Sequence, residues 1–137
     1  MSGDQRRTEN WRSPCKIRTC VDKQRVQPGP KERRKNEEFL RNYCVKPPER
    51  YAILKELTVQ NYCGEILERQ KTEVNYDEIL YVFGIEKKLK LKLEPGEKNV
   101  EIYIKVQFFK LNNDDNDYTL LVSFHEAEHP LKYMFKK

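Results

Sequence analysis

Hydrophobic and polar residues alternate most regularly in the second half of the chain. Leucines alternate with lysines over residues 88–94, and large apolar residues alternate with polar ones over 101–108. A period of two residues predicts a β-strand with one buried face. Similar short patterns predict a third strand over 120–124 and a fourth over 131–135. Together they indicate an antiparallel β-meander of three to four strands.

The middle of the chain has apolar residues at helical spacing instead. Over 49–57 and over 58–70 they recur every three or four positions, which predicts amphipathic helices. Asn75 and Glu78 form a capping pair that predicts a further short helix over 76–83. Two or three helices therefore precede the meander, and the predicted fold class is α+β.

The first third of the chain lacks either pattern. Residues 1–36 hold few large apolar side chains, and prolines interrupt the stretch. Such a segment cannot bury enough apolar surface to offset the entropy of ordering it, about 1–2 kcal/mol per residue. We therefore expect residues 1–48 to form a largely disordered arm with a short helix over 31–43. Residues 49–137 are expected to form a small α+β domain.

Charge changes along the chain at the same place. The 137 residues carry a formal net charge of +5. Residues 1–50 contain 14 Lys/Arg and 7 Asp/Glu, a balance of +7, whereas residues 51–137 contain 13 and 15, a balance of −2. This asymmetry predicts a basic N-terminal arm joined to a nearly neutral domain.

Length and hydropathy exclude several classes of protein. A chain of 137 residues is too short for a TIM barrel or a Rossmann dehydrogenase. It has no run of about 18 apolar residues, so no membrane span is expected. The N-terminus has no apolar stretch behind its charges, so no signal peptide is expected.

The most conspicuous motif is the string from His125 to His129, which matches the H-E-x-x-H pattern of zinc peptidases. In that pattern two histidines on one helix face bind zinc, and the glutamate activates water. Here the string follows a predicted strand, and Pro130 opposes a helix through it. We interpret the string as a polar strand end. An enzyme that uses His125, Glu126 and His129 is the least favoured hypothesis.

The cysteines do not form the paired knuckles of a structural zinc site. Only Cys15 and Cys20 approach the required spacing, and a site that adds His125 and His129 stays a minor alternative. Disulfides are not expected without a signal peptide. The glycines do not form a phosphate-binding loop. We predict no metal, no cofactor and no small-molecule substrate.

A basic run within the arm is the clearest indication of a binding function. Clustered lysines and arginines are typical of a nuclear import signal, or of a patch that contacts nucleic acid or an acidic protein. The residues predicted to make these contacts are Lys23, Arg25, Lys31, Arg33, Arg34 and Lys35. A nuclear location is therefore expected, with the cytoplasm as the alternative. Ser13, followed by Pro14, is a predicted phosphorylation site.

Three aromatic residues are predicted to contact a partner. Trp11 lies in the arm, and Tyr103 and Phe109 share the polar-alternating face of the second strand with Lys105. Aromatic side chains beside basic ones on a sheet can stack on nucleic-acid bases. Packing against a helix or another chain explains the same pattern equally well.

The favoured hypothesis is a non-enzymatic protein–protein interaction module, an adaptor or complex subunit that binds a partner or itself. The alternative is a nucleic-acid-binding protein that uses the arm and a sheet face. The position of basic residues discriminates between the two. An exposed apolar patch favours a protein partner, whereas a continuous basic patch favours nucleic acid. The lysines expected to join the arm in such a patch are Lys87, Lys88, Lys90, Lys92 and Lys105.

Overall fold

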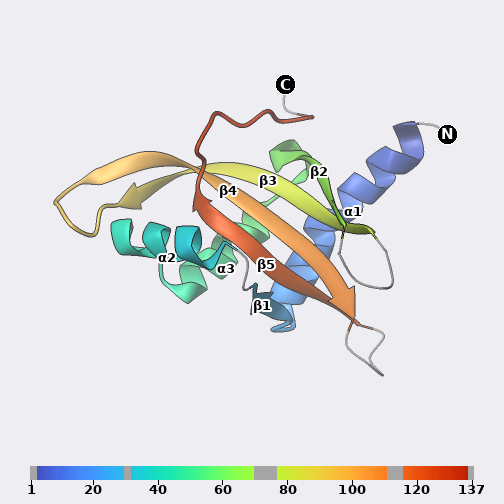
Figure 1. Cartoon of the computed structure of the whole chain (residues 1–137), viewed down its shortest axis with the longest axis horizontal. Helices are drawn as coiled ribbons and strands as arrows, with labels where there is room; N and C mark the ends of the chain where they lie inside the picture. The colour runs from blue at the N-terminus through green and yellow to red at the C-terminus, as the bar shows by residue number, and fades with distance from the viewer. Residues whose placement is uncertain (1–2, 30–31, 70–76, 111–115, 136–137) are drawn as a thin grey trace.

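The computed structural model describes residues 3–29, 32–69, 77–110 and 116–135, of which 3–11, 68–69 and 77–78 are described through the backbone alone. Its elements follow one another as α1 (Gly3–Asp22), β1 (Val26–Pro28), α2 (Arg33–Asn42), α3 (Pro47–Glu56), the 3-10 turn η1 (Val59–Asn61), β2 (Tyr62–Arg69), β3 (Asp77–Lys90), β4 (Glu97–Lys110) and β5 (Asp117–Glu126). The described part of the chain is therefore α+β, as predicted, with three helices and a five-stranded sheet (Figure 1).

The sheet is mixed, with the strand order β1-β5-β4-β3-β2. The strands from β2 to β5 form the predicted antiparallel meander, but β1 pairs in parallel with β5 and sets Val26 opposite Thr119. The prediction of a purely antiparallel sheet of three to four strands is therefore wrong in number and in direction. A three-residue strand has no hydrophobic period of its own, so the sequence could not indicate β1.

The helices predicted over 58–70 and 76–83 are also wrong, because these residues contain η1, β2 and the start of β3. A register shift lies between Tyr62 and Gly64, where Gly64 adopts a φ of 138°. This bulge interrupts the two-residue period of β2. In β3, the apolar run is buried on both faces, and such a run cannot be distinguished from a helix by periodicity.

Other predicted elements agree with the structure more closely. The helices expected over 31–43 and 49–57 correspond to α2 and α3, and the strands over 101–108 and 120–124 lie within β4 and β5. The predicted strand over 88–94 is mostly wrong, because β3 ends at its third residue.

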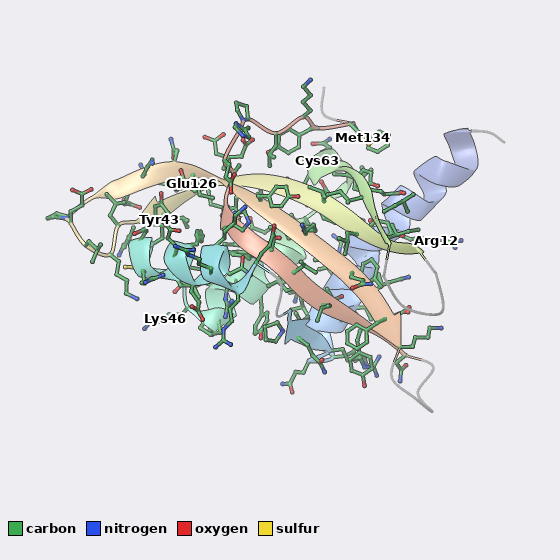
Figure 2. The ribbon with its side chains drawn as sticks, viewed as in Figure 1. Arg12, Tyr43, Lys46, Cys63, Glu126 and Met134 are labelled. Atoms are coloured by element: carbon green, nitrogen blue, oxygen red, sulfur yellow. The ribbon has the colours of Figure 1, made fainter. Side chains whose placement is uncertain are left out.

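The C-terminal residues do not form the predicted fourth strand. Over 131–135 the chain is irregular, and the backbone N–H of Met134 donates a hydrogen bond of 3.0 Å to the carbonyl oxygen of Tyr62. This contact places the C-terminal segment beside the start of β2 (Figures 1 and 2).

The core lies between the sheet and the helices. Val100, Ile102, Ile104 and Val106 alternate onto one face of β4 and are at most 1% exposed. The side chains that cover them come from α1, α2, α3, β3 and β5. They include Ile17, Phe39, Leu54, Phe83 and Phe124. We call this helix-covered side of the sheet the inner face and the opposite side the outer face.

Within the described part of the first 48 residues, for which we expected a largely disordered arm, several side chains join the core. Ile17 of α1 is fully buried, and Phe39 and Tyr43 join the same core cluster as residues of α3 and the sheet. Isolated apolar side chains in a polar segment give no periodic signal, so composition alone suggested disorder. Whether residues 49–137 fold by themselves stays a prediction, but their core in this structure is completed by residues of the first 48.

The outer face is partly covered by the C-terminal segment. The backbone N–H of Leu131 donates to one oxygen of Glu101 at 3.1 Å, and the Tyr133 hydroxyl donates to the other at 2.8 Å. Beneath them lies Gly84, where a Cβ atom would stand 2.5 Å from the Leu131 side chain. A side chain at this position would therefore displace the segment.

Replacing Ile17 tests whether α1 belongs to the folded core. Because the side chain is fully buried, we expect Ile17→Ala to lower the free energy of unfolding by about 2–5 kcal/mol. Urea unfolding followed by circular dichroism measures the change. Thr19→Ala, at an exposed position of the same helix, is the control and should cost far less. Equal stability of the two variants would contradict the packing of α1.

Candidate functional site

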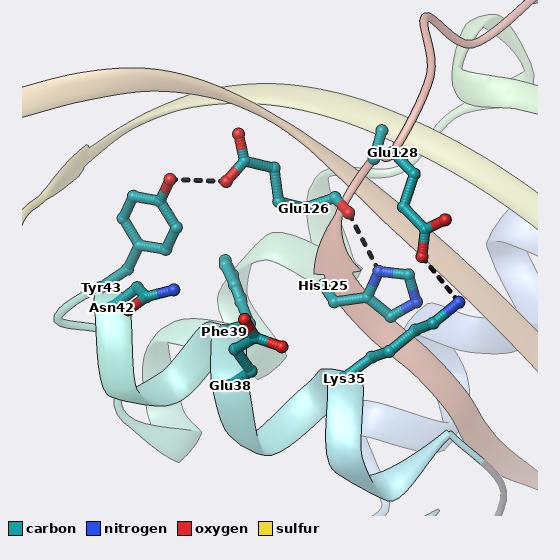
Figure 3. A pocket seen from close by; sticks show the side chains of 9 residues that line it. Lys35, Glu38, Phe39, Asn42, Tyr43, His125, Glu126 and Glu128 are labelled. Carbon is teal, nitrogen blue, oxygen red and sulfur yellow. Dashed lines mark hydrogen bonds and ion pairs between the residues drawn. The ribbon is translucent and has the colours of Figure 1, made fainter.

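The H-E-x-x-H string lies at the junction of α2 and the end of β5. His125 and Glu126 are the last two residues of β5, and the strand has ended before Glu128 and His129. A cavity of about 270 Å³ opens between this strand end and α2 (Figure 3). Its walls include the side chains of Lys35, Phe39, Tyr43, His125, Glu126 and Glu128.

His125 is buried and oriented by its own strand. Its Nδ1 lies 3.0 Å from the carbonyl oxygen of Glu126, and since a carbonyl only accepts, Nδ1 donates. Its Nε2 lies 3.6 Å from Oε2 of Glu32, and neither atom has a hydrogen-bond partner within the described structure. Lys105 lies 3.5 Å from the other oxygen of Glu32. The carboxylate of Glu32 is thus held between α2 and the outer face of the sheet.

Glu32 is the residue of this site that the sequence analysis missed. It is the N-cap of α2, and its φ of 58° places it in the left-handed region that is unusual for a residue other than glycine. The strain is retained because the surrounding contacts to Lys105 and His125 determine where the side chain lies. No sequence pattern marks such a position.

The arrangement does not support zinc catalysis. The two histidines lie on a strand end and a following irregular segment, so they do not share a helix face. Within residues 3–29, 32–69, 77–110 and 116–135, no group of three or more His, Cys, Asp or Glu side chains is placed to hold a metal ion.

The four cysteines are present as free thiols. Cys20 is buried and donates from Sγ to the carbonyl oxygen of Asp117 at 3.3 Å, while Cys15 lies 3.1 Å from a guanidinium nitrogen of Arg18. Burial, with a smaller effect of Glu101, raises the pKa of Cys63 to about 11. A thiol with this pKa is almost fully protonated at neutral pH and is a poor nucleophile.

The acidic side chains of the cleft are engaged in internal contacts. Glu126 accepts a hydrogen bond of 2.6 Å from the Tyr43 hydroxyl and lies 3.5 Å from Lys98. Glu128 lies 2.6 Å from Lys35, which lowers the pKa of Glu128 and raises that of Lys35. Both members of this second pair are exposed, so it contributes little to stability.

The predicted basic contact residues differ in their pairing and exposure. Arg33 is paired with Glu37 at 2.9 Å and Lys35 with Glu128, whereas Lys23 and Arg34 are exposed. The sixth residue, Lys31, lies outside the described residues. Arg25 is half-buried at the start of β1, with its guanidinium 6.0 Å from the ring centre of Tyr118.

The lysines of the sheet are also placed among opposite charges and acceptors. Lys87 lies 2.9 Å from Glu56, Lys105 pairs with Glu32, and Lys92 donates to the carbonyl oxygen of Leu40. Lys88 and Lys90 are exposed. Three of the five lysines are therefore engaged by acceptors of their own chain.

The predicted aromatic contact residues have neighbours within the sheet. Tyr103 stacks on His125 with ring centres 5.4 Å apart, and Phe109 stacks on Tyr118 at 5.5 Å. Burial raises the pKa of Tyr103, and Lys105 lies 5.8 Å from its ring. The prediction that Tyr103, Phe109 and Lys105 share one face of β4 agrees with their register.

The two candidates in α1 differ in what the structure describes. Trp11 lies within the helix, but its side chain is outside the described part of the chain. Ser13 is only 3% exposed, so a kinase cannot reach its hydroxyl without displacing α1. Its phosphorylation stays a prediction that requires this displacement.

An exposed apolar patch lies at the β2 end of the sheet. Ile66 is 41% exposed, Leu67 is 63% exposed, and Ile79, which pairs with Leu67, is 40% exposed. We call these three residues the edge patch. The sequence analysis missed it because it placed Ile66 and Leu67 on the buried face of a helix. A strand prediction for these residues would have located the patch at a sheet edge.

Comparison with protein-family models gave no match for this chain, and searches of curated proteins and of solved structures gave none either. Among the described residues, no helix has an apolar stretch long enough to cross a membrane. The function must therefore be inferred from the geometry itself.

The hydrogen bond between Tyr43 and Glu126 makes stability depend on pH in the alkaline range. Burial and the nearby carboxylate raise the pKa of Tyr43 to about 12, above its ordinary value of about 10. The stabilising contribution is complete below about pH 10 and is lost as pH rises toward 12. Tyr43→Phe should therefore cost about 1 kcal/mol at neutral pH and progressively less above pH 10.

Urea unfolding of the wild type and of Tyr43→Phe across this pH range measures the effect. Tyr51→Phe is the control because Tyr51 is an exposed tyrosine of α3. A difference between wild type and Tyr43→Phe that does not change with pH would contradict this role of the hydrogen bond.

Proposed function

We propose that this protein is a non-enzymatic protein–protein interaction module, an adaptor or complex subunit, that binds another chain at the edge patch. The observation that carries the proposal is the position of three exposed apolar residues on and beside the terminal strand of the sheet. A terminal strand with exposed apolar residues favours association, because pairing hydrogen-bonds its free edge and removes apolar surface from water.

The distribution of charge supports a protein partner over nucleic acid. The basic residues Arg33, Lys35 and Lys105 lie beside glutamates, so their charge is neutralised locally. Nucleic-acid affinity depends on cations that are free to replace counterions along the phosphates. Exposed apolar residues at the end of the sheet, the feature expected for a protein partner, therefore support a protein.

The proposal that the protein is not an enzyme is supported by the internal hydrogen bonds of His125 and Glu126, the candidate catalytic residues. Nδ1 of His125 donates to a backbone carbonyl, and the Glu126 carboxylate accepts from Tyr43. The contact of His125 fixes its ring within β5, and the contact of Glu126 joins Tyr43, the C-cap of α2, to the end of β5. A nuclear location remains part of the proposal on the strength of the basic N-terminal run, and the cytoplasm remains the alternative.

One observation favours the nucleic-acid alternative. A groove of about 440 Å³ lies where α1, the start of β1 and the start of β5 meet, and Arg12, Lys16 and Arg25 line it. Lys16 lies 4.9 Å from the ring centre of Phe108. Cations beside aromatic rings are typical of single-strand binding sites. Asp117, 3.6 Å from Lys16, reduces the positive charge of the groove.

Replacing the most exposed residue on β2 tests the proposed function. We expect Leu67→Lys to reduce capture of partner proteins from a cell extract at least tenfold, about 1.4 kcal/mol, because it charges the edge patch. Quantitative mass spectrometry after nuclease treatment, in about 0.5 M NaCl, measures capture independently of weak electrostatic binding. Leu93→Lys is the matched control, since Leu93 is 81% exposed but lies outside the edge patch. Identical capture by all three proteins would contradict the proposal.

The alternative has its own test. If the groove binds nucleic acid, a labelled single-stranded RNA should bind with a salt-dependent Kd that Arg25→Glu weakens at least about fivefold. Fluorescence anisotropy measures the Kd, and Lys88→Glu, at an exposed position of β3, serves as the control. Absence of binding, or equal binding by both variants, would remove this alternative.

A further inference from the structure

The two edges of the sheet differ in how far other parts of the chain cover their backbone hydrogen-bonding groups. At one end, β1 covers the first part of β5, and the backbone N–H of Gly29 continues this pairing to the carbonyl oxygen of Leu121. Asn36 of α2 then donates from its side-chain amide to the carbonyl of Val122 at 3.0 Å and accepts from the N–H of Phe124 at 2.9 Å. The amide thus replaces a neighbouring strand.

At the other end, the sheet stops at β2 in the part of the chain that the structure describes. Met134 reaches the start of this strand, at Tyr62 and Gly64. The open run is therefore the second half of β2, residues 65–69. It contains no proline and no lysine, two residues that commonly protect an exposed strand from pairing, and its charged residues are Glu65, Glu68 and Arg69.

Both faces of the open run carry apolar residues. Leu67 pairs with Ile79 on the inner face, and Ile66 pairs with Leu80 on the outer face. A strand added beside β2 would therefore cover apolar side chains on both sides of the sheet while it hydrogen-bonds the free backbone edge.

The order of residues in this run is complementary to itself. When two β2 strands pair antiparallel about a two-fold axis perpendicular to the sheet, inner-face residues must lie opposite inner-face residues. With Leu67 opposite Leu67 of the second copy, Glu65 stands opposite Arg69 of the second copy, and this happens twice. With Ile66 opposite itself, Glu65 would stand opposite Leu67, and no opposite charges would meet. The register centred on Leu67 is therefore favoured.

We propose that two copies of this chain associate by antiparallel pairing of their β2 strands, with Leu67 on the two-fold axis and Glu65 opposite Arg69 of the second copy. The proposal rests on the proposed function, because it uses the edge patch and makes a second copy its occupant. Five residue pairs form a smaller contact than the standard interface of about 1,600 Å², so the dimer should have a Kd of about 1–100 µM.

Sedimentation velocity over a concentration series tests the association. The wild type and Leu93→Lys should change from a mass of 16.6 kDa toward twice that value as concentration rises through about 1–300 µM. Leu67→Lys should remain a monomer throughout, with a far-ultraviolet spectrum like that of the wild type. A wild type that stays monomeric, or a dimer that survives Leu67→Lys, would overturn the proposal.

A charge exchange tests the register. Glu65→Arg sets like charges opposite each other and should raise the Kd of the dimer about tenfold. Adding Arg69→Glu should restore the Kd to within about threefold of the wild type. Glu65 also accepts a hydrogen bond of 2.9 Å from Tyr62 of its own chain, and the second substitution cannot restore that bond. Because both variants lack that bond, the difference between their Kd values measures the charge pairing alone, and equal Kd values would reject the contact between copies in this register.

The outcomes separate this inference from the proposed function. A monomeric wild type whose capture of other proteins is lost in Leu67→Lys would overturn the second copy as occupant and leave the interaction module standing. A dimer that Leu67→Lys abolishes would support both. A monomeric wild type that captures the same proteins as Leu67→Lys would reject both.

Discussion

Four side chains on one face of β4, Val100, Ile102, Ile104 and Val106, must be kept from water, and a sheet alone cannot do this. Burying apolar surface yields about 25 cal/mol per Å², so a layer that covers all four is the main source of stability. α1, α2 and α3 supply that layer, and all three precede residue 57. Residues of the basic first third of the chain, such as Ile17 and Phe39, thus pack in the core.

This packing also determines where the charges lie. The helices that cover the inner face also bring acidic residues to lysines of the sheet. Glu32, the N-cap of α2, meets Lys105 on the outer face of β4, and Glu56 of α3 meets Lys87 of β3. The pair of Lys87 and Glu56 is partly exposed and contributes little by itself, since exposed ion pairs are worth about 0–1 kcal/mol. Each pair sets one negative charge beside a lysine, so Lys105 and Lys87 add little to a basic surface.

The sequence allowed the regular parts of the fold to be predicted and not the interrupted ones. The alternation in β4 is uninterrupted, and the strand was located correctly. The bulge at Gly64 breaks the alternation of β2, and local periodicity then favoured a helix. Ile17 is a single buried residue in a polar helix, so its burial depends on partners that are distant in sequence. The edge patch was missed because the two-residue period of β2 is interrupted. The role of Glu32 was missed because it depends on Lys105 and His125, which are distant in sequence.

The bulge at Gly64 also affects which residues of β2 are buried and which are exposed. The bulge allows Tyr62 to remain on the inner face against Phe83, with ring centres 5.6 Å apart, while the residues beyond it continue to the end of the sheet. At the opposite end, Asn36 uses its side-chain amide to satisfy a strand edge that the three residues of β1 do not reach. The β2 edge has no such cover over residues 65–69 in the described part of the chain, and Ile66 and Leu67 are exposed there, so a partner that pairs with this edge would bury apolar surface and form backbone hydrogen bonds together.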